Sequence, residues 1–273
     1  MSDNKNTELN QGAAADEETH SAAMREAISA IDVSHSLSEP LKRAVDDLLG
    51  VAAQSVGSAD GSVLIRDGNE GGLKFLVAVS ELEEELLKIR IPPGKGIAGL
   101  VFSSGQPMAV NDVSEEGSFW SQADKKTGFK TVTLLATPLR TRNETIGVLE
   151  FVNRPGEPPY PPFTPEEMDR AARFADIIAR LVDAYELAVL IESVFDRAVK
   201  TTSNSSEMRS DLREWLGSVD APPEHRELLM LTICLTEIVS RGEAEREMCR
   251  DLLETISRFT EKRSASSSSY FNF

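Results

Sequence analysis

The run from Phe119 to Thr131 brings an acidic side chain and hydroxyl groups together around a glycine, directly before the strand-like residues 132–139. Asp124 and Thr127 lie three residues apart, and Thr131 follows four residues later. Such groups exchange hydrogen bonds with polar small molecules, so the run predicts one wall of a ligand pocket. The alternative is a solvated loop held by an Asx turn or a threonine turn.

The composition argues against several classes of function. The 273 residues include 45 acidic and 29 basic side chains, and the net charge of −16 opposes binding to nucleic acid or to an anionic membrane. Apolar runs such as Leu187–Ile191 are too short to span a bilayer, and we see no apolar signal region. Cys234 and Cys249 belong to no metal-binding pattern. We therefore expect a cytoplasmic protein without a metal centre.

The chain is long enough for one main domain and an appendage, and its patterning predicts four regions. Residues 1–35 are polar and alanine-rich, and we expect a disordered or variable segment there. A main domain with a long exit helix is predicted over 36–200, and a helical region over 205–262. The serine-rich residues 263–273 are predicted to form a flexible tail, which ends in the aromatic Tyr270–Phe273.

Turn residues and hydrophobic periodicity predict a central antiparallel sheet with inserted helices. Two strand-like segments are separated by a glycine-rich turn and form a hairpin. Proline and glycine residues then interrupt the chain before a short helix that ends at Gly105. The expected strands are 61–66, 73–79, 108–110, 132–139 and 145–152, and the expected helices of this part begin at Ser38 and Ile97.

The exit helix has a clear start signal. Thr164 is the expected N-cap residue, Pro165 the first helical residue, and Glu167 the matching acid of a capping box. Apolar spacing continues this helix to about Val199. The all-apolar run Leu187–Ile191 favours a dimer seam, with packing inside the domain as the alternative.

Five motifs follow one another in a recognisable order. They are Gly96-Ile97-Ala98-Gly99, Asp112-Val113, the run from Phe119 to Thr131, Pro138 at the end of a buried strand, and Ile146 through Asn153. Over about residues 36–200 this order resembles the GAF domains of cyclic-nucleotide phosphodiesterases and of bacterial adenylyl cyclases. The resemblance implies an α+β fold with helices on both sides of the sheet, followed here by a small all-α region.

The resemblance also implies a cyclic-nucleotide ligand and a set of contact residues. The matching positions are Ser62, Ser80, Ile97, Ala98, Asp112, Phe119, Trp120, Asp124, Thr127, Thr131 and Glu150. Guanine-selective members place an acid where this chain has Ser80, and a hydroxyl is a poorer partner for the guanine N1–H and N2–H pair. Cyclic AMP is therefore favoured over cyclic GMP. Two alternatives stay open, namely that Glu150 faces solvent and that Ser62 is an ordinary strand serine.

The function implied by this resemblance is that of a non-enzymatic sensor. Haem-binding, bilin-binding and sulfoxide-reducing members of the family need a histidine or cysteine that the core of the main domain lacks. Arg154 and Glu167 match a basic and acidic pair of the family, for which we expect a structural role. We expect a homodimer formed through the exit helix and an effector protein that the sequence does not name. The alternative is a dimeric protein-interaction adaptor with a vestigial pocket.

Overall fold

The computed structural model describes residues 37–68, 70–142, 144–200, 205–239 and 242–268. The chain divides into two compact units, residues 1–201 and residues 202–273. The segment 1–35, for which disorder is predicted, and the aromatic end Tyr270–Phe273 lie outside the described residues.

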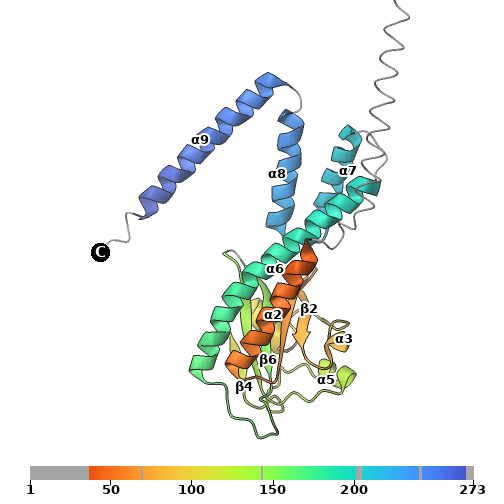
Figure 1. The fold of residues 1–273 in the computed structure, drawn as a ribbon, viewed down its shortest axis with the longest axis vertical. Helices are drawn as coiled ribbons and strands as arrows, with labels where there is room; N and C mark the ends of the chain where they lie inside the picture. The colour runs from red at the N-terminus through yellow and green to blue at the C-terminus, as the bar shows by residue number, and fades with distance from the viewer. Residues whose placement is uncertain (1–36, 69, 143, 201–204, 240–241, 269–273) are drawn as a thin grey trace, which may run out of the picture. The chain divides into compact units, whose positions relative to one another are not determined.

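The first unit is built on a six-stranded sheet with the strand order β3-β2-β1-β6-β5-β4 (Figure 1). Every neighbouring pair of strands is antiparallel, and β1 and β2 form the predicted hairpin. The predicted α+β fold is thereby confirmed. The strands are β1 (Asp60–Asp67), β2 (Gly72–Val79), β3 (Arg90–Ile91), β4 (Met108–Val110), β5 (Leu134–Arg140) and β6 (Thr145–Val152).

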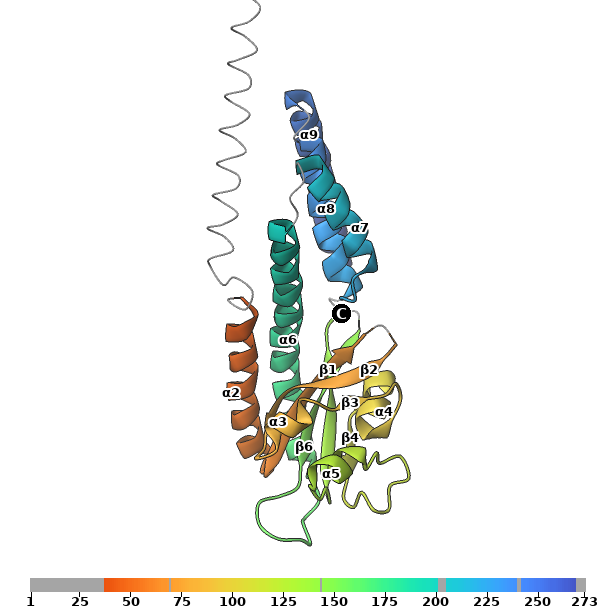
Figure 2. The same cartoon turned by 90° about the vertical axis from the view of Figure 1, so that its right-hand side faces the viewer.

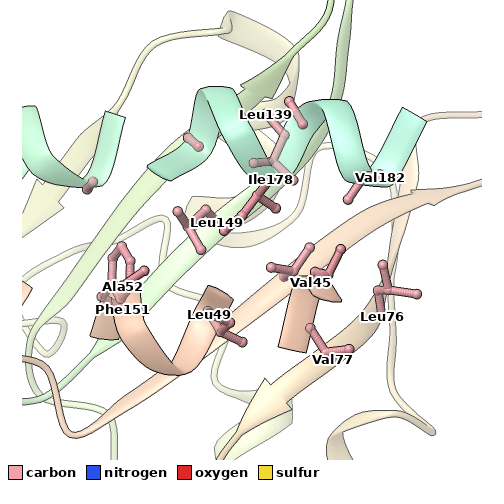
Figure 3. Packing of buried hydrophobic residues seen from close by; sticks show 14 of the residues in the cluster. Val45, Leu49, Ala52, Leu76, Val77, Leu139, Leu149, Phe151, Ile178 and Val182 are labelled. Atoms are coloured by element: carbon pink, nitrogen blue, oxygen red, sulfur yellow. The ribbon is translucent and has the colours of Figure 1, made fainter. Parts of the chain in front are cut away.

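One face of the sheet is covered by α2 (Ser38–Val56) and α6 (Pro165–Lys200), which also pack against each other (Figure 2). Successive side chains of a strand point to opposite faces, and Leu149 and Phe151 of β6 point towards these helices. They pack with Leu49 of α2 and Ile178 of α6 in a cluster of fully buried side chains (Figure 3). This cluster is the main core of the first unit.

Thr137 places a hydroxyl in this core without a hydrogen-bond partner among the described residues. It lies on β5 directly opposite the fully buried Leu149. A buried hydroxyl without a partner costs about 1–3 kcal/mol. The T137V variant is therefore expected to raise the free energy of unfolding by about 1 kcal/mol, measured by urea denaturation. The control is T141V, which removes a hydroxyl that donates to the Glu144 carbonyl. A less stable T137V protein would contradict the assignment.

The start of α2 is capped by a side chain that is distant in sequence. Both oxygens of Glu192, on α6, accept hydrogen bonds, from the backbone N–H groups of Leu37 and Ser38 at 2.9 and 2.8 Å and from the Ser38 hydroxyl at 2.8 Å. The first N–H groups of a helix have no partner within the helix, and its N-terminus favours negative charge. Glu192 therefore ties the start of α2 to α6.

The helix α6 begins at Pro165, and the predicted capping box is confirmed. The Thr164 N–H donates to Glu167, and the Glu167 N–H donates to the Thr164 hydroxyl. In the apolar run Leu187–Ile191 of α6, Leu190 is buried, whereas Val189 is exposed over 37% of its surface. The apolar run thus has a covered side and an open side, and the dimer seam stays a prediction.

The opposite face of the sheet carries three short helices, α3 (Glu83–Leu86), α4 (Gly96–Ser104) and α5 (Gln122–Thr127) (Figure 2). The predicted helix that ends at Gly105 is α4, and Gly105 has a φ of +62°, which a glycine adopts readily. The sequence reasoning did not predict α3. It also predicted no helix in the run from Phe119 to Thr131, whereas α5 forms inside that run.

The second unit contains α7 (Ser205–Ser218), α8 (Pro223–Val239) and α9 (Glu243–Ser268), with α8 in contact with both of the others. The helix α9 continues to Ser268, into the range for which a flexible tail is predicted. Leu228, Leu231 and Leu235 of α8 are exposed. Within the described ranges, no helix is both long enough and apolar enough to cross a bilayer.

Candidate ligand-binding site

A cavity of about 80 Å³ lies between the sheet, the region of α3 and the α5 segment, which we define as residues 122–131. Five of the residues predicted to bind a ligand line it, namely Ser62, Ser80, Asp124, Thr127 and Thr131. The other lining residues are Asp60, Gly61, Phe75, Leu82, Leu86, Ala123, Phe129 and Val152.

The cavity is too small for a nucleotide as it stands. Pockets for drug-sized ligands measure about 300–1,000 Å³, and a cavity of about 150 Å³ holds benzene. The two helices beside the cavity, α3 and α5, contact each other and span only four and six residues. A ligand of nucleotide size therefore requires α3 and α5 to move apart.

Ser62 presents its hydroxyl from the sheet wall of the cavity. It lies on β1, is 5% exposed, and stands directly opposite Glu150 of β6. Among the described residues, no group forms a hydrogen bond with this hydroxyl. A buried hydroxyl that borders a cavity gains a partner when a polar ligand enters. This placement is consistent with the predicted role of Ser62 in binding.

The polar side chains of the α5 segment already bond to one another. The Asp124 carboxylate accepts hydrogen bonds from the Thr131 N–H at 2.9 Å and from the Thr131 hydroxyl at 2.8 Å. The Thr127 hydroxyl donates to the Ala123 carbonyl and accepts from the Phe129 N–H. The contact of Thr127 with Phe129 is the threonine turn of the alternative, whereas Asp124 forms no Asx turn, because its partner Thr131 lies seven residues further along the chain. The same three side chains also line the cavity.

Asn153 anchors the end of the α5 segment to the sheet. Its amide oxygen accepts from the N–H groups of Val132 and Thr133 at 2.8 and 3.2 Å, and its amide nitrogen donates to the Lys130 carbonyl at 2.9 Å. Asn153 has a φ of +56°, a conformation that asparagine tolerates better than most residues. Any displacement of the α5 segment must act on this side chain.

Five of the other predicted residues do not line the cavity. Ile97 and Ala98 are buried in a second cluster of apolar side chains, which lies on the α4 side of the sheet and includes Val148 of β6. Phe119 and Trp120 pack half-buried against that cluster. Asp112 is exposed and accepts hydrogen bonds from Ser114, which lower its pKa. Their predicted role in binding stays a prediction.

Glu150 is buried beside the cavity without lining it. It is 8% exposed and lies opposite Ser62 and Ala136 on the two flanking strands, so the alternative of a solvent-facing side chain is wrong. Among the described residues the Glu150 carboxyl has no hydrogen-bond partner. Burial raises its pKa from 4.5 to about 7.

The sequence reasoning missed Asp60, which lines the cavity from the first position of β1. Side chains two residues apart on a strand share a face, so the prediction for Ser62 could have drawn attention to Asp60. The reasoning also missed Leu82 and Leu86, because it did not predict α3. Among the described residues, no group of three or more His, Cys, Asp or Glu side chains could hold a metal ion.

The candidate site is thus a small cavity between an antiparallel sheet and the α5 segment, in a unit whose sheet leads into the long helix α6. The model of the family described as GAF domain matches residues 40–182, which is more than half of the chain. The chain belongs to the GAF domain family.

A stretch of the chain is also similar to part of a curated protein. The chain is 39% identical over 67 residues to the probable 3',5'-cyclic phosphodiesterase pde-5 of Caenorhabditis elegans. The matched stretch covers 24% of this chain and only 9% of that protein, so most of the relative has no counterpart in the match.

Two solved structures that contain a GAF domain have a similar chain path. The GAF domain/HD domain protein from Geobacter sulfurreducens is 15% identical, with a TM-score of 0.47, and the match covers 56% of this chain and 98% of that one. The GAF domain from an Acinetobacter phosphoenolpyruvate-protein phosphotransferase is 14% identical, with a TM-score of 0.45, over 58% of this chain and 90% of that one. Sequence identities and TM-scores as low as these carry no information about which ligand this chain binds.

Proposed function

We propose that this chain is a non-enzymatic cytoplasmic sensor, which binds a cyclic nucleotide in the cavity and regulates a partner protein through α6 and the C-terminal helices. One observation carries the proposal. Three segments far apart in sequence, namely β1, the end of β2 and the α5 segment, bring five residues of the predicted binding set to a single cavity. The partial identity with a probable 3',5'-cyclic phosphodiesterase supports the same ligand class.

The contacts of Asn153 suggest how occupancy reaches α6. A ligand that displaces the α5 segment strains the hydrogen bonds between Asn153 and residues 130–133. The next residue, Arg154, forms an ion pair with Glu167 in the first turn of α6. The two states in this proposal have the α5 segment in place or displaced. A ligand shifts the equilibrium between them only if its affinity for the two states differs. In this proposal the difference arises at the α5 segment.

Thermal unfolding of the full chain with added nucleotides tests the proposal. Cyclic AMP or cyclic GMP at a hundred times its dissociation constant is expected to stabilise the protein by about 2.7 kcal/mol, which raises the unfolding midpoint. The linear monophosphates AMP and GMP serve as comparison ligands. The sequence-based preference for cyclic AMP rests on Ser80 alone.

A matched pair of serine variants tests whether the ligand that raises the unfolding midpoint binds in the cavity. S62A removes the buried hydroxyl in the sheet wall and is expected to weaken the cyclic nucleotide's binding several-fold, because the ligand loses one hydrogen bond. S103A changes an exposed serine of α4 and is expected to bind as the unaltered protein does. An equal loss in both variants would argue against the cavity as the binding site.

One observation favours the adaptor as a second candidate. Leu228, Leu231 and Leu235 follow one another at helical spacing on α8 and are all exposed. Exposed apolar patches often mark surfaces for protein partners. In the adaptor, no nucleotide raises the unfolding midpoint.

A further inference from the structure

Asp60 and Ser80 form a polar corner of the cavity, where β1 begins and β2 ends. The two antiparallel strands pair with Gly61 opposite Val79. Asp60 precedes Gly61 and Ser80 follows Val79, so both lie at the same end of the hairpin, one on each strand. Both line the cavity, and the Ser80 hydroxyl lies close enough to the Asp60 carboxyl group to lower its pKa. Asp60 therefore supplies a carboxylate at this corner, where Ser80 supplies only a hydroxyl.

The Asp60 carboxylate has capacity for further hydrogen bonds. Burial raises its pKa above the ordinary 3.8, the bond from Ser80 lowers it, and the charge of Glu81 raises it. Among the described residues, Ser80 is the one group that lowers this pKa. An ionised carboxylate offers about four lone-pair sites. Asp60 can thus accept two parallel bonds from a ligand, in a partly buried place where such bonds are stronger than in water.

The charges of the lining determine which end of a nucleotide fits the cavity. The lining residues include two carboxylates, Asp60 and Asp124, and no Lys, Arg or His. A phosphate placed among these residues would be repelled, whereas the N–H edge of a base would be attracted. Apolar side chains, Phe75 and Phe129 among them, suit the faces of a heteroaromatic ring. The base therefore enters the cavity and the phosphate stays outside it.

We infer that Asp60 selects the base of the ligand and favours guanine, an inference that rests on the proposed binding of a cyclic nucleotide. Guanine presents N1–H and N2–H side by side, and these two donors match the two oxygens of one carboxylate. Adenine presents one donor, N6–H, beside the acceptor N1, which would face a carboxylate lone pair. The preference for cyclic AMP assumed a hydroxyl alone at this corner, and Asp60 supplies the missing acceptor from the neighbouring strand.

Calorimetric titration of the full chain with cyclic GMP, cyclic AMP and cyclic IMP tests this role. The unaltered protein is expected to bind cyclic GMP at least about ten-fold more tightly than cyclic AMP. D60N is expected to reverse the preference, because an asparagine accepts from adenine N6–H and donates to adenine N1. D47N, an exposed change on α2 at the opposite face of the sheet, is expected to keep the preference for cyclic GMP.

Cyclic IMP gives a second measurement that needs no variant. It keeps the N1–H of guanine and lacks the N2 amino group, so the unaltered protein is expected to bind it several-fold more weakly than cyclic GMP. Equal affinities for the two would contradict the inference even if D60N did not fold.

The outcomes separate the inference from the proposed function. Binding of cyclic nucleotides with a ratio of dissociation constants that D60N leaves unchanged would overturn the role of Asp60 and leave the sensor standing. A tighter complex of the unaltered protein with cyclic AMP would do the same. If no cyclic nucleotide bound, both the sensor and the selection by Asp60 would fall.

Discussion

Replacing Arg154 with alanine is expected to lower the free energy of unfolding of the first unit by about 3–5 kcal/mol. The Arg154 side chain is 9% exposed and pairs with both oxygens of Glu167, at 3.0 and 2.7 Å. This pair is the predicted structural contact between the end of the sheet and the exit helix, and the structure confirms it. Its loss would leave the Glu167 carboxylate without the hydrogen bond that most lowers its pKa.

Arg154 also donates hydrogen bonds to backbone carbonyls at the end of α2 and just before α6. Its guanidinium donates to the carbonyls of Val56 and Gly57 at the end of α2, and to the carbonyl of Pro162 just before α6. The last carbonyls of a helix lack intrahelical partners and favour a cation. The guanidinium also lies 4.2 Å from the centre of the Phe163 ring. One side chain thereby joins the end of α2 to the start of α6.

Urea denaturation of three variants checks this account. R154K is expected to lose about 2 kcal/mol, because a lysine keeps the charge without the planar set of donors that reaches both helices. R43A serves as the control, since Arg43 is exposed and, among the described residues, forms an ion pair with Glu39 alone. A change within about 0.5 kcal/mol is expected. An R154A protein as stable as R43A would show that water replaces these contacts at little cost.

Local signals in the sequence were enough to predict most of the framework. The hairpin of β1 and β2 follows from two apolar runs around a glycine-rich turn, and the start of α6 follows from the capping box at Thr164. Each of these features depends on residues a few positions apart. The helix α3 did not follow, because a four-residue acidic helix is too short to show a periodicity.

The cavity depends on contacts between distant residues, so the sequence predicted it only in part. Leu86 reaches the cavity because α3 packs against α5, which no local pattern encodes. Asp60 looks like a turn residue before a strand, and only the register of the hairpin places it beside Ser80. Five of the residues that the resemblance implies for ligand binding line the cavity. The resemblance could not show that the Asp124 carboxylate is already bonded to Thr131.

The pH dependence of stability is expected to carry a signature of Glu150. A carboxyl group whose pKa is raised by folding binds its proton more tightly in the folded state, so it favours folding at low pH. Its contribution is fully present below the ordinary pKa of 4.5 and is lost as the pH rises towards about 7. The shift corresponds to about 3 kcal/mol, because one pKa unit is worth about 1.4 kcal/mol. Glu167, whose pKa is lowered, acts in the opposite sense and loses its contribution on acidification.

The E150Q variant isolates this contribution, because a glutamine does not ionise. Relative to the unaltered protein, E150Q is expected to gain about 3 kcal/mol in free energy of unfolding between pH 4.5 and about pH 8, measured by urea denaturation at each pH. E115Q provides the control, since Glu115 is exposed, and its curve is expected to run parallel to that of the unaltered protein. Parallel curves for E150Q as well would mean that the Glu150 carboxyl reaches water in solution. The cavity beside Ser62 would then open without a ligand, because Glu150 lies next to it on the same face of the sheet.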